Sequence, residues 1–154
     1  MLATVERLQR TLSDTAKASL DRRFGALFDK VYRKDVLWQA WRLVRANNGG
    51  PGIDEQTCDY IENEIGVIPF LAELRDELRT GTYRPQPVKR CWIDKPGRKD
   101  KRPLGIPVVR DRVAQTAMKL VLEPIFETNF DRDSYGFRPG KSAQDAISEI
   151  QRSI

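Results

Sequence analysis

The chain has 154 residues, of which 40% are hydrophobic and 32% are charged, and its formal net charge is +5. This hydrophobic fraction can supply a core, which argues against disorder of the whole chain. No apolar run approaches the roughly 18 residues that a membrane span needs, and the N-terminus lacks the charged-then-apolar layout of a signal peptide. We therefore expect a cytoplasmic protein with no membrane partner.

Histidine is absent, and Cys58 and Cys91 are the two cysteines. Most transition-metal sites need clusters of His and Cys, and a mechanism with an imidazole base is excluded outright. No Ser/Lys or Cys/His arrangement for covalent catalysis is visible. No carboxylate pair stands out either, since the neighbouring Asp131 and Asp133 are typical of a turn. The sequence therefore predicts neither a catalytic residue nor a metal site.

The positive charge is concentrated in the middle of the chain. The stretch from Arg79 to Lys119 contains 12 Lys/Arg against 3 Asp/Glu, a local net charge of +9. The remainder contains 15 Lys/Arg against 19 Asp/Glu, a net of −4. A basic middle between mildly acidic ends indicates a polyanionic partner such as nucleic acid. A solvated charged surface with no ligand is the alternative.

Helical periodicity dominates the first part of the chain. Apolar residues recur at spacings of three and four over residues 2–20 and again over 24–31, which predicts amphipathic helices. Asp35 is expected to cap a third helix. The Asn/Gly/Pro run at 47–52 ends it, because Gly and Asn tolerate the left-handed conformation and Pro cannot extend a helix.

A fourth helical region is expected over 54–81, interrupted near Gly66 and Pro69. The period then changes, because residues 88–93 and 104–109 are short, rich in β-formers and bounded by turn residues. We expect two antiparallel strands there, joined by the basic loop 95–102.

The remaining residues return to helical patterns. Asp111 is expected to cap a helix that Pro124 kinks or restarts. The loop 131–141 follows, and Ser142 with Asp145 three residues later predicts a capping-box start for a last helix that reaches Ile154 without a stop signal. The fold class expected is therefore α+β, mostly helical with a small antiparallel β-hairpin.

The loop between the two strands is unusually basic. Its five cations are Lys95, Arg98, Lys99, Lys101 and Arg102. Ammonium and guanidinium groups at the tip of a hairpin can close over phosphates with charge-assisted hydrogen bonds. A mobile surface loop without a ligand is the alternative.

The loop before the last helix combines aromatic and basic side chains. Tyr135 and Phe137 offer stacking faces, while Arg138 and Lys141 offer phosphate contacts beside a helix N-terminus. A loop whose aromatic rings plug a core is the alternative. The Gly-Lys-Ser run at 140–142 does not form a P-loop, because the glycine required five residues before Gly140 is replaced by Tyr135.

Several runs of residues are shared with one known family. They read Gly-Gly-Pro-Gly-Ile-Asp at 49–54, Gly-Thr-Tyr-Arg-Pro at 81–85, Lys-Pro-Gly at 95–97, Lys-Arg-Pro-Leu-Gly-Ile-Pro at 101–107, Arg-Asp-Arg-Val-Ala-Gln at 110–115, Leu-Glu-Pro-Ile-Phe-Glu at 122–127 and Asp-Ser-Tyr-Gly-Phe-Arg-Pro-Gly-Lys-Ser-Ala at 133–143. Together they resemble the N-terminal extension and the first two conserved blocks of group II intron reverse transcriptases, over roughly residues 35–150.

This resemblance implies a reverse-transcriptase fingers region at 35–154, preceded by an N-terminal helical extension at 1–34, with the palm absent. It implies that Lys95 and Arg102 meet the triphosphate of an incoming dNTP. The family's template-side positions match Arg110, Arg112, Phe137 and Arg138. Charge alone adds Arg98, Lys99, Lys101 and Lys141 as nucleic-acid-binding residues.

In this family the palm supplies aspartates that bind two Mg²⁺ ions for phosphoryl transfer, and those motifs do not occur in the 154 residues. The resemblance therefore implies a parent RNA-directed DNA polymerase with RNA template, primer, dNTP and intron RNA as partners, and a chain that does not polymerise by itself. A homodimer is expected through apolar helix faces that the palm would cover.

Other interpretations of the same residues remain open. One is a non-catalytic RNA-binding or splicing-helper module. Another is a reverse transcriptase of a retron, diversity-generating or CRISPR-linked lineage, since these share parts of both blocks. A basic protein with neither role is the third.

Overall fold

A computed structural model of the chain describes residues 2–19 and 21–153. It is mostly helical and contains one two-stranded antiparallel sheet, which confirms the α+β class expected from the hydrophobic periodicity. Of the helices in these residues, none is long and apolar enough to cross a membrane.

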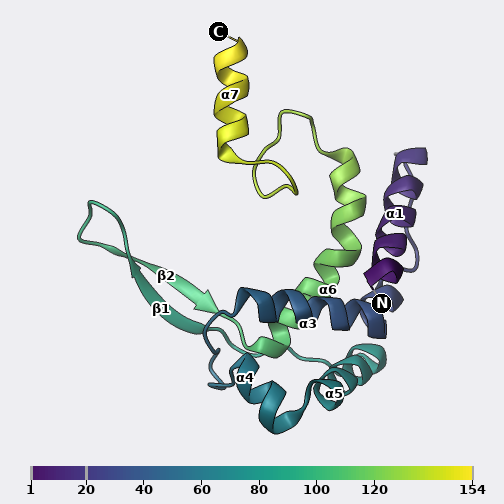
Figure 1. Cartoon of the computed structure of the whole chain (residues 1–154), viewed down its shortest axis with the longest axis vertical. Helices are drawn as coiled ribbons and strands as arrows, with labels where there is room; N and C mark the ends of the chain where they lie inside the picture. The colour runs from purple at the N-terminus through teal and green to yellow at the C-terminus, as the bar shows by residue number, and fades with distance from the viewer. Residues whose placement is uncertain (1, 20, 154) are drawn as a thin grey trace.

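Seven α-helices and two strands follow one another along the described residues (Figure 1). Their bounds are α1 Leu2–Ala18, α2 Phe28–Val31, α3 Lys34–Asn47, α4 Cys58–Tyr60, α5 Val67–Thr80, β1 Lys89–Asp94, β2 Lys101–Ile106, α6 Val109–Phe126 and α7 Ala143–Ser153. A π-helical turn, Ile61–Ile65, continues α4, and a 3₁₀ turn, Glu127–Asn129, continues α6.

The hydrophobic core is built around α6. Figure 1 shows α3 crossing α6 and α1 running beside it, and each of these helices packs against α6. Val113, Ala117 and Val121 form the fully buried stripe of α6, and Leu37 and Trp41 of α3 belong to the same core. The three- and four-residue spacing of these side chains is the pattern from which the helices were predicted.

Pro124 lies inside α6 without ending it. A proline has no N–H to donate to the carbonyl four residues earlier, here that of Leu120. The side-chain amide of Gln9 in α1 donates to this carbonyl at 3.1 Å. The helix that was expected to kink or restart therefore continues to Phe126, because a neighbouring helix supplies the missing donor.

The residues predicted to end or cap helices do so in some cases and not in others. Asn48 ends α3 in the left-handed conformation with φ of 40°, and Gly81 ends α5 with φ of 73°. The prediction that Asp35 caps α3 was wrong: the cap position is Arg33, and the Asp35 carboxylate pairs with the Arg33 guanidinium at 2.7 Å. The Arg33 guanidinium, two residues away, donates two hydrogen bonds to this carboxylate, and such charge-assisted pairs are strong.

The hairpin formed by β1 and β2 projects away from the helical body (Figure 1). Strand β2 runs from Lys101 to Ile106 rather than over 104–109, because Lys101 and Arg102 pair with Asp94 and Ile93 of β1. An exposed two-stranded ribbon tolerates charged side chains, so the basic pattern alone did not show where the loop ended. Val109 begins α6 instead.

Candidate nucleic-acid interface

The cations of the hairpin differ in whether a carboxylate neutralises them. Lys89 pairs with Glu55 at 2.7 Å, Lys101 pairs with Asp94 at 3.3 Å, and Lys95 pairs with Asp100. Among residues 2–19 and 21–153, four hairpin cations have no carboxylate partner: Arg90, Arg98, Lys99 and Arg102. Residues 89–106 contain seven Lys/Arg against two Asp/Glu, a net charge of +5.

The ladder register assigns Arg102 to one face of the ribbon. Arg102 lies directly opposite Ile93, and side chains of directly opposed residues point to the same face. Half-buried and exposed residues alternate along β1, and this alternation continues through Lys95. Arg102 therefore falls on the same face as Ile93, and the alternation indicates this face also for Lys95, which directly follows β1.

The base of the hairpin is fixed tightly to the body. A Cβ on Gly105 would lie 2.8 Å from Val88 Cγ2, and a Cβ on Gly52 would lie 2.6 Å from the Val108 backbone. Only glycine allows these two close approaches. The strands that carry the cations thus start from a packed support.

Asp111 completes this support, but it does so in a way that the sequence did not indicate. Its carboxylate is 2% exposed and accepts hydrogen bonds from Tyr83 Oη at 2.5 Å and from the Gln86 backbone N–H at 2.8 Å. The prediction that Asp111 caps α6 was wrong, because the cap position is Val108. Burial and this hydrogen bond raise the pKa of Tyr83 well above its usual value.

Arg110 and Arg112, expected on the template side, have partners within the fold. Arg110 pairs with Glu77 at 2.6 Å and with Glu73 at 3.5 Å. Arg112 donates to the backbone carbonyls of Gly49 and Gly50 at 3.1 and 2.8 Å. Both arginines therefore help to hold the structure, and their contact with a template stays a prediction.

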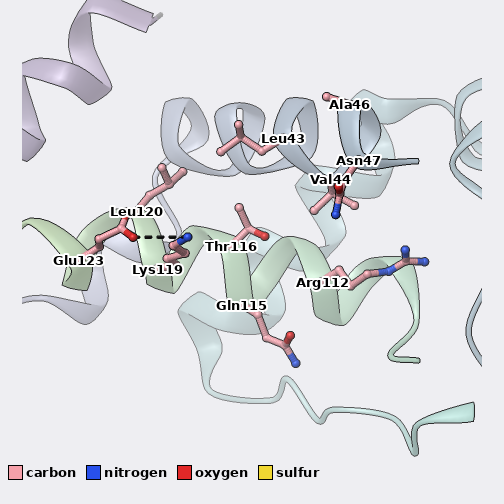
Figure 2. A pocket seen from close by; sticks show the side chains of 10 residues that line it. All are labelled: Leu43, Val44, Ala46, Asn47, Arg112, Gln115, Thr116, Lys119, Leu120 and Glu123. Atoms are coloured by element: carbon pink, nitrogen blue, oxygen red, sulfur yellow. Dashed lines mark ion pairs between the residues drawn. The ribbon is translucent and has the colours of Figure 1, made fainter. Parts of the chain in front are cut away.

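A pocket of about 540 Å³ lies between α3 and α6. Figure 2 shows Leu43 of α3 and Leu120 of α6 facing this space, with Arg112 at one end. The Lys119–Glu123 ion pair, at 3.3 Å, lies at the other end (Figure 2). The sequence indicated Arg112 but not the pocket, which depends on how two helices distant in the chain cross.

The loop over 131–141 is organised around Arg138, whose side chain is 9% exposed. Its guanidinium pairs with Glu127 at 2.6 Å and donates to the carbonyls of Asp131 and Ser134 at 2.6 and 2.8 Å. It also lies 5.2 Å from the centre of the Phe130 ring. Arg138 thus holds the loop together in this structure, and its contact with nucleic acid remains a prediction.

The other residues of this loop are more accessible. Phe137 is fully exposed and has φ of 58°, and Lys141 lies 4.3 Å from the centre of the Tyr135 ring. The predicted capping box is confirmed: the Ser142 N–H donates to Asp145 at 2.8 Å, and the Asp145 N–H donates to Ser142 Oγ at 3.2 Å.

The hairpin and the loop over 131–141 lie apart in this structure. Figure 1 shows the hairpin projecting to one side of α6, while the loop lies between the end of α6 and α7 on the same side. The two basic segments are therefore separate parts of the surface in this structure.

Comparisons with known proteins give several relatives. The group II intron-encoded protein LtrA of Lactococcus lactis subsp. cremoris is 34% identical over the whole chain, which spans 25% of that protein. Protein YkfC of Escherichia coli (strain K12) is 36% identical over 97% of the chain, which spans 39% of it. Nuclear intron maturase 2, mitochondrial, of Arabidopsis thaliana is 39% identical over 29% of the chain and 6% of its own length. No family model matches.

The helical fold with its basic hairpin and these relatives define the chain as a region of an intron-encoded protein. The alignments with LtrA and YkfC cover nearly all of its residues, including both motif blocks. The chain belongs to the family of group II intron reverse transcriptases and maturases, and it corresponds to their N-terminal region. It spans between a quarter and two-fifths of the length of these two relatives.

Proposed function

We propose that this chain is the fingers portion of a group II intron-type RNA-directed DNA polymerase and maturase, in which it holds the RNA template and the incoming dNTP. In this proposal residues 1–34 are the N-terminal extension and residues 35–154 are the fingers. Helix α1 packs in the same core as α6, so the extension would act as a support for the fingers rather than as a separate unit.

The observation that supports the proposal is the ladder position of Arg102 opposite Ile93, next to the end of β1 that Lys95 follows. The guanidinium of Arg102 has no carboxylate partner among the described residues, and guanidinium can bind phosphate oxygens in a bidentate manner. Lys95 would exchange its Asp100 contact for the phosphate. The two cations together would neutralise the triphosphate and align its α-phosphate.

The whole protein would use Mg²⁺ with a primer and intron RNA. Within residues 2–19 and 21–153 there is no group of three or more His, Cys, Asp or Glu side chains that could hold a metal ion. These residues therefore do not fit the ion. The part played by this chain would be binding and alignment, and residues 1–154 alone would not extend a primer.

The proposal is tested by replacing Lys95 and Arg102 together with Ala in the full-length protein that contains this region. We expect the KM for dNTP in primer extension to rise, while the Kd for template RNA changes little. Arg98→Ala with Lys99→Ala is the matched control, because it removes the same charge from the turn between the strands. Equal loss of template binding and dNTP use, or an equal effect of the control, would overturn the assignment.

A second candidate is an RNA-binding splicing helper without polymerase activity. It is favoured by the similarity to a relative named as a nuclear intron maturase and by the internal partners of Arg110 and Arg138, which leave fewer cations for a template. Splicing stimulation by a full-length protein that retains RNA binding but shows no dNTP dependence would support this candidate over the first.

A further inference from the structure

The hairpin has a second face, opposite to that of Lys95 and Arg102. It carries Arg90, Trp92 and Asp94 of β1, and their ladder partners Gly105, Pro103 and Lys101 of β2. All six residues are exposed. Trp92 lies in the middle of this face with 59% of its surface accessible, whereas Trp41 is buried and Trp38 packs against the core.

The surroundings of Trp92 are basic rather than apolar. Arg90, two residues earlier on the same strand, lies about 7 Å along the ribbon and has no carboxylate partner among the described residues. Its ladder partner is Gly105, which has no side chain, and the Val88 side chain lies over this glycine. On the other side of Trp92, Lys101 pairs with Asp94 at 3.3 Å. An exposed indole thus lies between two cations.

We propose that the Trp92 face binds unpaired RNA, with the indole stacked on a base and with Arg90 and Lys101 on flanking phosphates. Every base has a π-face on which an aromatic ring can stack, so this contact is tolerant of sequence. It requires an unpaired base, because in a double helix stacking on the neighbouring base pairs covers both faces of each base. A protein partner would favour a continuous apolar surface around the ring. Here Pro103 is the apolar ladder partner of Trp92, and the other exposed apolar side chain of this face, Val88, lies beyond Arg90, against Gly105.

The inference adds a contact to the proposed RNA binding, on which it rests, and it concerns a different face from the triphosphate pair. The two faces are separated by the thickness of one ribbon. An RNA single strand that stacks on Trp92 would therefore pass along the Trp92 face of the hairpin, while a nucleotide occupies the face of Lys95 and Arg102.

The test uses the 154-residue chain and fluorescein-labelled single-stranded RNA of about 12 nucleotides, with fluorescence anisotropy as the readout. Trp92→Leu should weaken binding by about tenfold, and Trp92→Phe should keep most of the affinity, because stacking contributes this much per base. Tyr60→Leu is the control, since Tyr60 is 47% exposed but lies beside the acidic residues Asp59 and Glu62.

An abasic oligonucleotide of the same length separates stacking from a structural role. If Trp92 stacks on bases, Trp92→Leu and the unchanged chain should bind the abasic strand equally well. Arg90→Gln should reduce the slope of log K against log salt by about 0.7, the contribution of one phosphate on a single strand.

Four results would overturn the inference. Unchanged affinity of Trp92→Leu for normal RNA would show that Trp92 does not contribute to binding, but it would leave the proposed RNA binding intact. Equal weakening on normal and abasic strands would assign the residue to folding or to phosphate contact. Failure of the unchanged chain to bind single-stranded RNA would remove both the inference and the proposed function, and loss of self-association in Trp92→Leu would assign the face to a second copy.

Discussion

Asp111 shows how one buried residue can fix the direction of the hairpin. It is the single buried charged side chain among residues 2–19 and 21–153, and it joins α6 to the segment that leads into β1 through Tyr83 and Gln86. Pro85 and Pro87 flank Gln86 and restrict the backbone there. The orientation of the cations thus depends on a carboxylate that touches none of them.

Replacing Asp111 with Ala should lower the free energy of unfolding by about 3 kcal/mol, because it leaves the Tyr83 hydroxyl and the Gln86 N–H without an acceptor at about 1–3 kcal/mol each. Urea denaturation followed by circular dichroism measures this change. Asp111→Asn keeps one acceptor oxygen and should lose less. A loss below about 0.5 kcal/mol for the Ala variant would show that the tether is unimportant.

The raised pKa of Tyr83 predicts a loss of stability in alkali. The unfolded phenol loses its proton near pH 10, while burial and Asp111 keep the folded phenol protonated to higher pH. The stabilisation is complete below pH 10 and is lost as pH rises above it. Tyr83→Phe should flatten this part of the curve of unfolding free energy against pH, and parallel curves for the two proteins would contradict the account.

At the scale of the elements, α6 depends on its neighbour α1. Gln9→Leu removes the donor that replaces the missing N–H of Pro124, leaving the Leu120 carbonyl without its partner. We expect a loss of about 1–2 kcal/mol in the free energy of unfolding. Gln9→Leu with Pro124→Ala should recover most of it, because an alanine N–H can bond to Leu120. No recovery in the double variant would refute this explanation.

Most helices could be predicted from the spacing of apolar residues, because α1, α3 and α6 each carry a continuous apolar stripe. Two helix ends could also be predicted, because Asn48 and Gly81 end helices as their residue types suggest. The roles of Asp35 and Asp111 could not, since an acid in a first helical turn can accept from its own helix or from a distant donor. The sequence also did not show which face of the hairpin Trp92 occupies. Cys91, Trp92 and Ile93 are all apolar, so polar and apolar residues do not alternate there.

At the scale of the whole molecule, α7 presents an apolar face to solvent. Ile147 and Ile150 are 56% and 61% exposed, and they lie three residues apart on one side of the helix. We expect the chain to self-associate through this face at tens of micromolar, as judged by light scattering. Ile147→Asn with Ile150→Asn should reduce the mass toward that of a monomer.

The control for this prediction removes two exposed isoleucines elsewhere. Ile53 and Ile68 are 52% and 76% exposed and lie outside α7, so replacing both with Asn should leave the association unchanged. A monomeric mass for the unchanged chain would contradict the prediction directly.

The proposed RNA binding depends on contacts between RNA phosphates and the hairpin cations that no carboxylate neutralises. Two variants of equal charge separate this surface from general basicity. The test variant replaces the four unpaired hairpin cations with Gln, namely Arg90, Arg98, Lys99 and Arg102. The control variant replaces four cations of the N-terminal region with Gln, namely Arg7, Arg10, Lys17 and Arg23.

The measurement is the affinity of the 154-residue chain for single-stranded RNA as a function of salt concentration. We predict that the hairpin variant binds more weakly and that the slope of log K against log salt shrinks by up to about 2, since Arg90, Arg98 and Lys99 would each contribute about 0.7, whereas Arg102 is assigned to the dNTP. The control variant should stay close to the unchanged chain. Equal losses in both variants, or an unchanged slope in the hairpin variant, would contradict the claim that the hairpin is the RNA-binding surface.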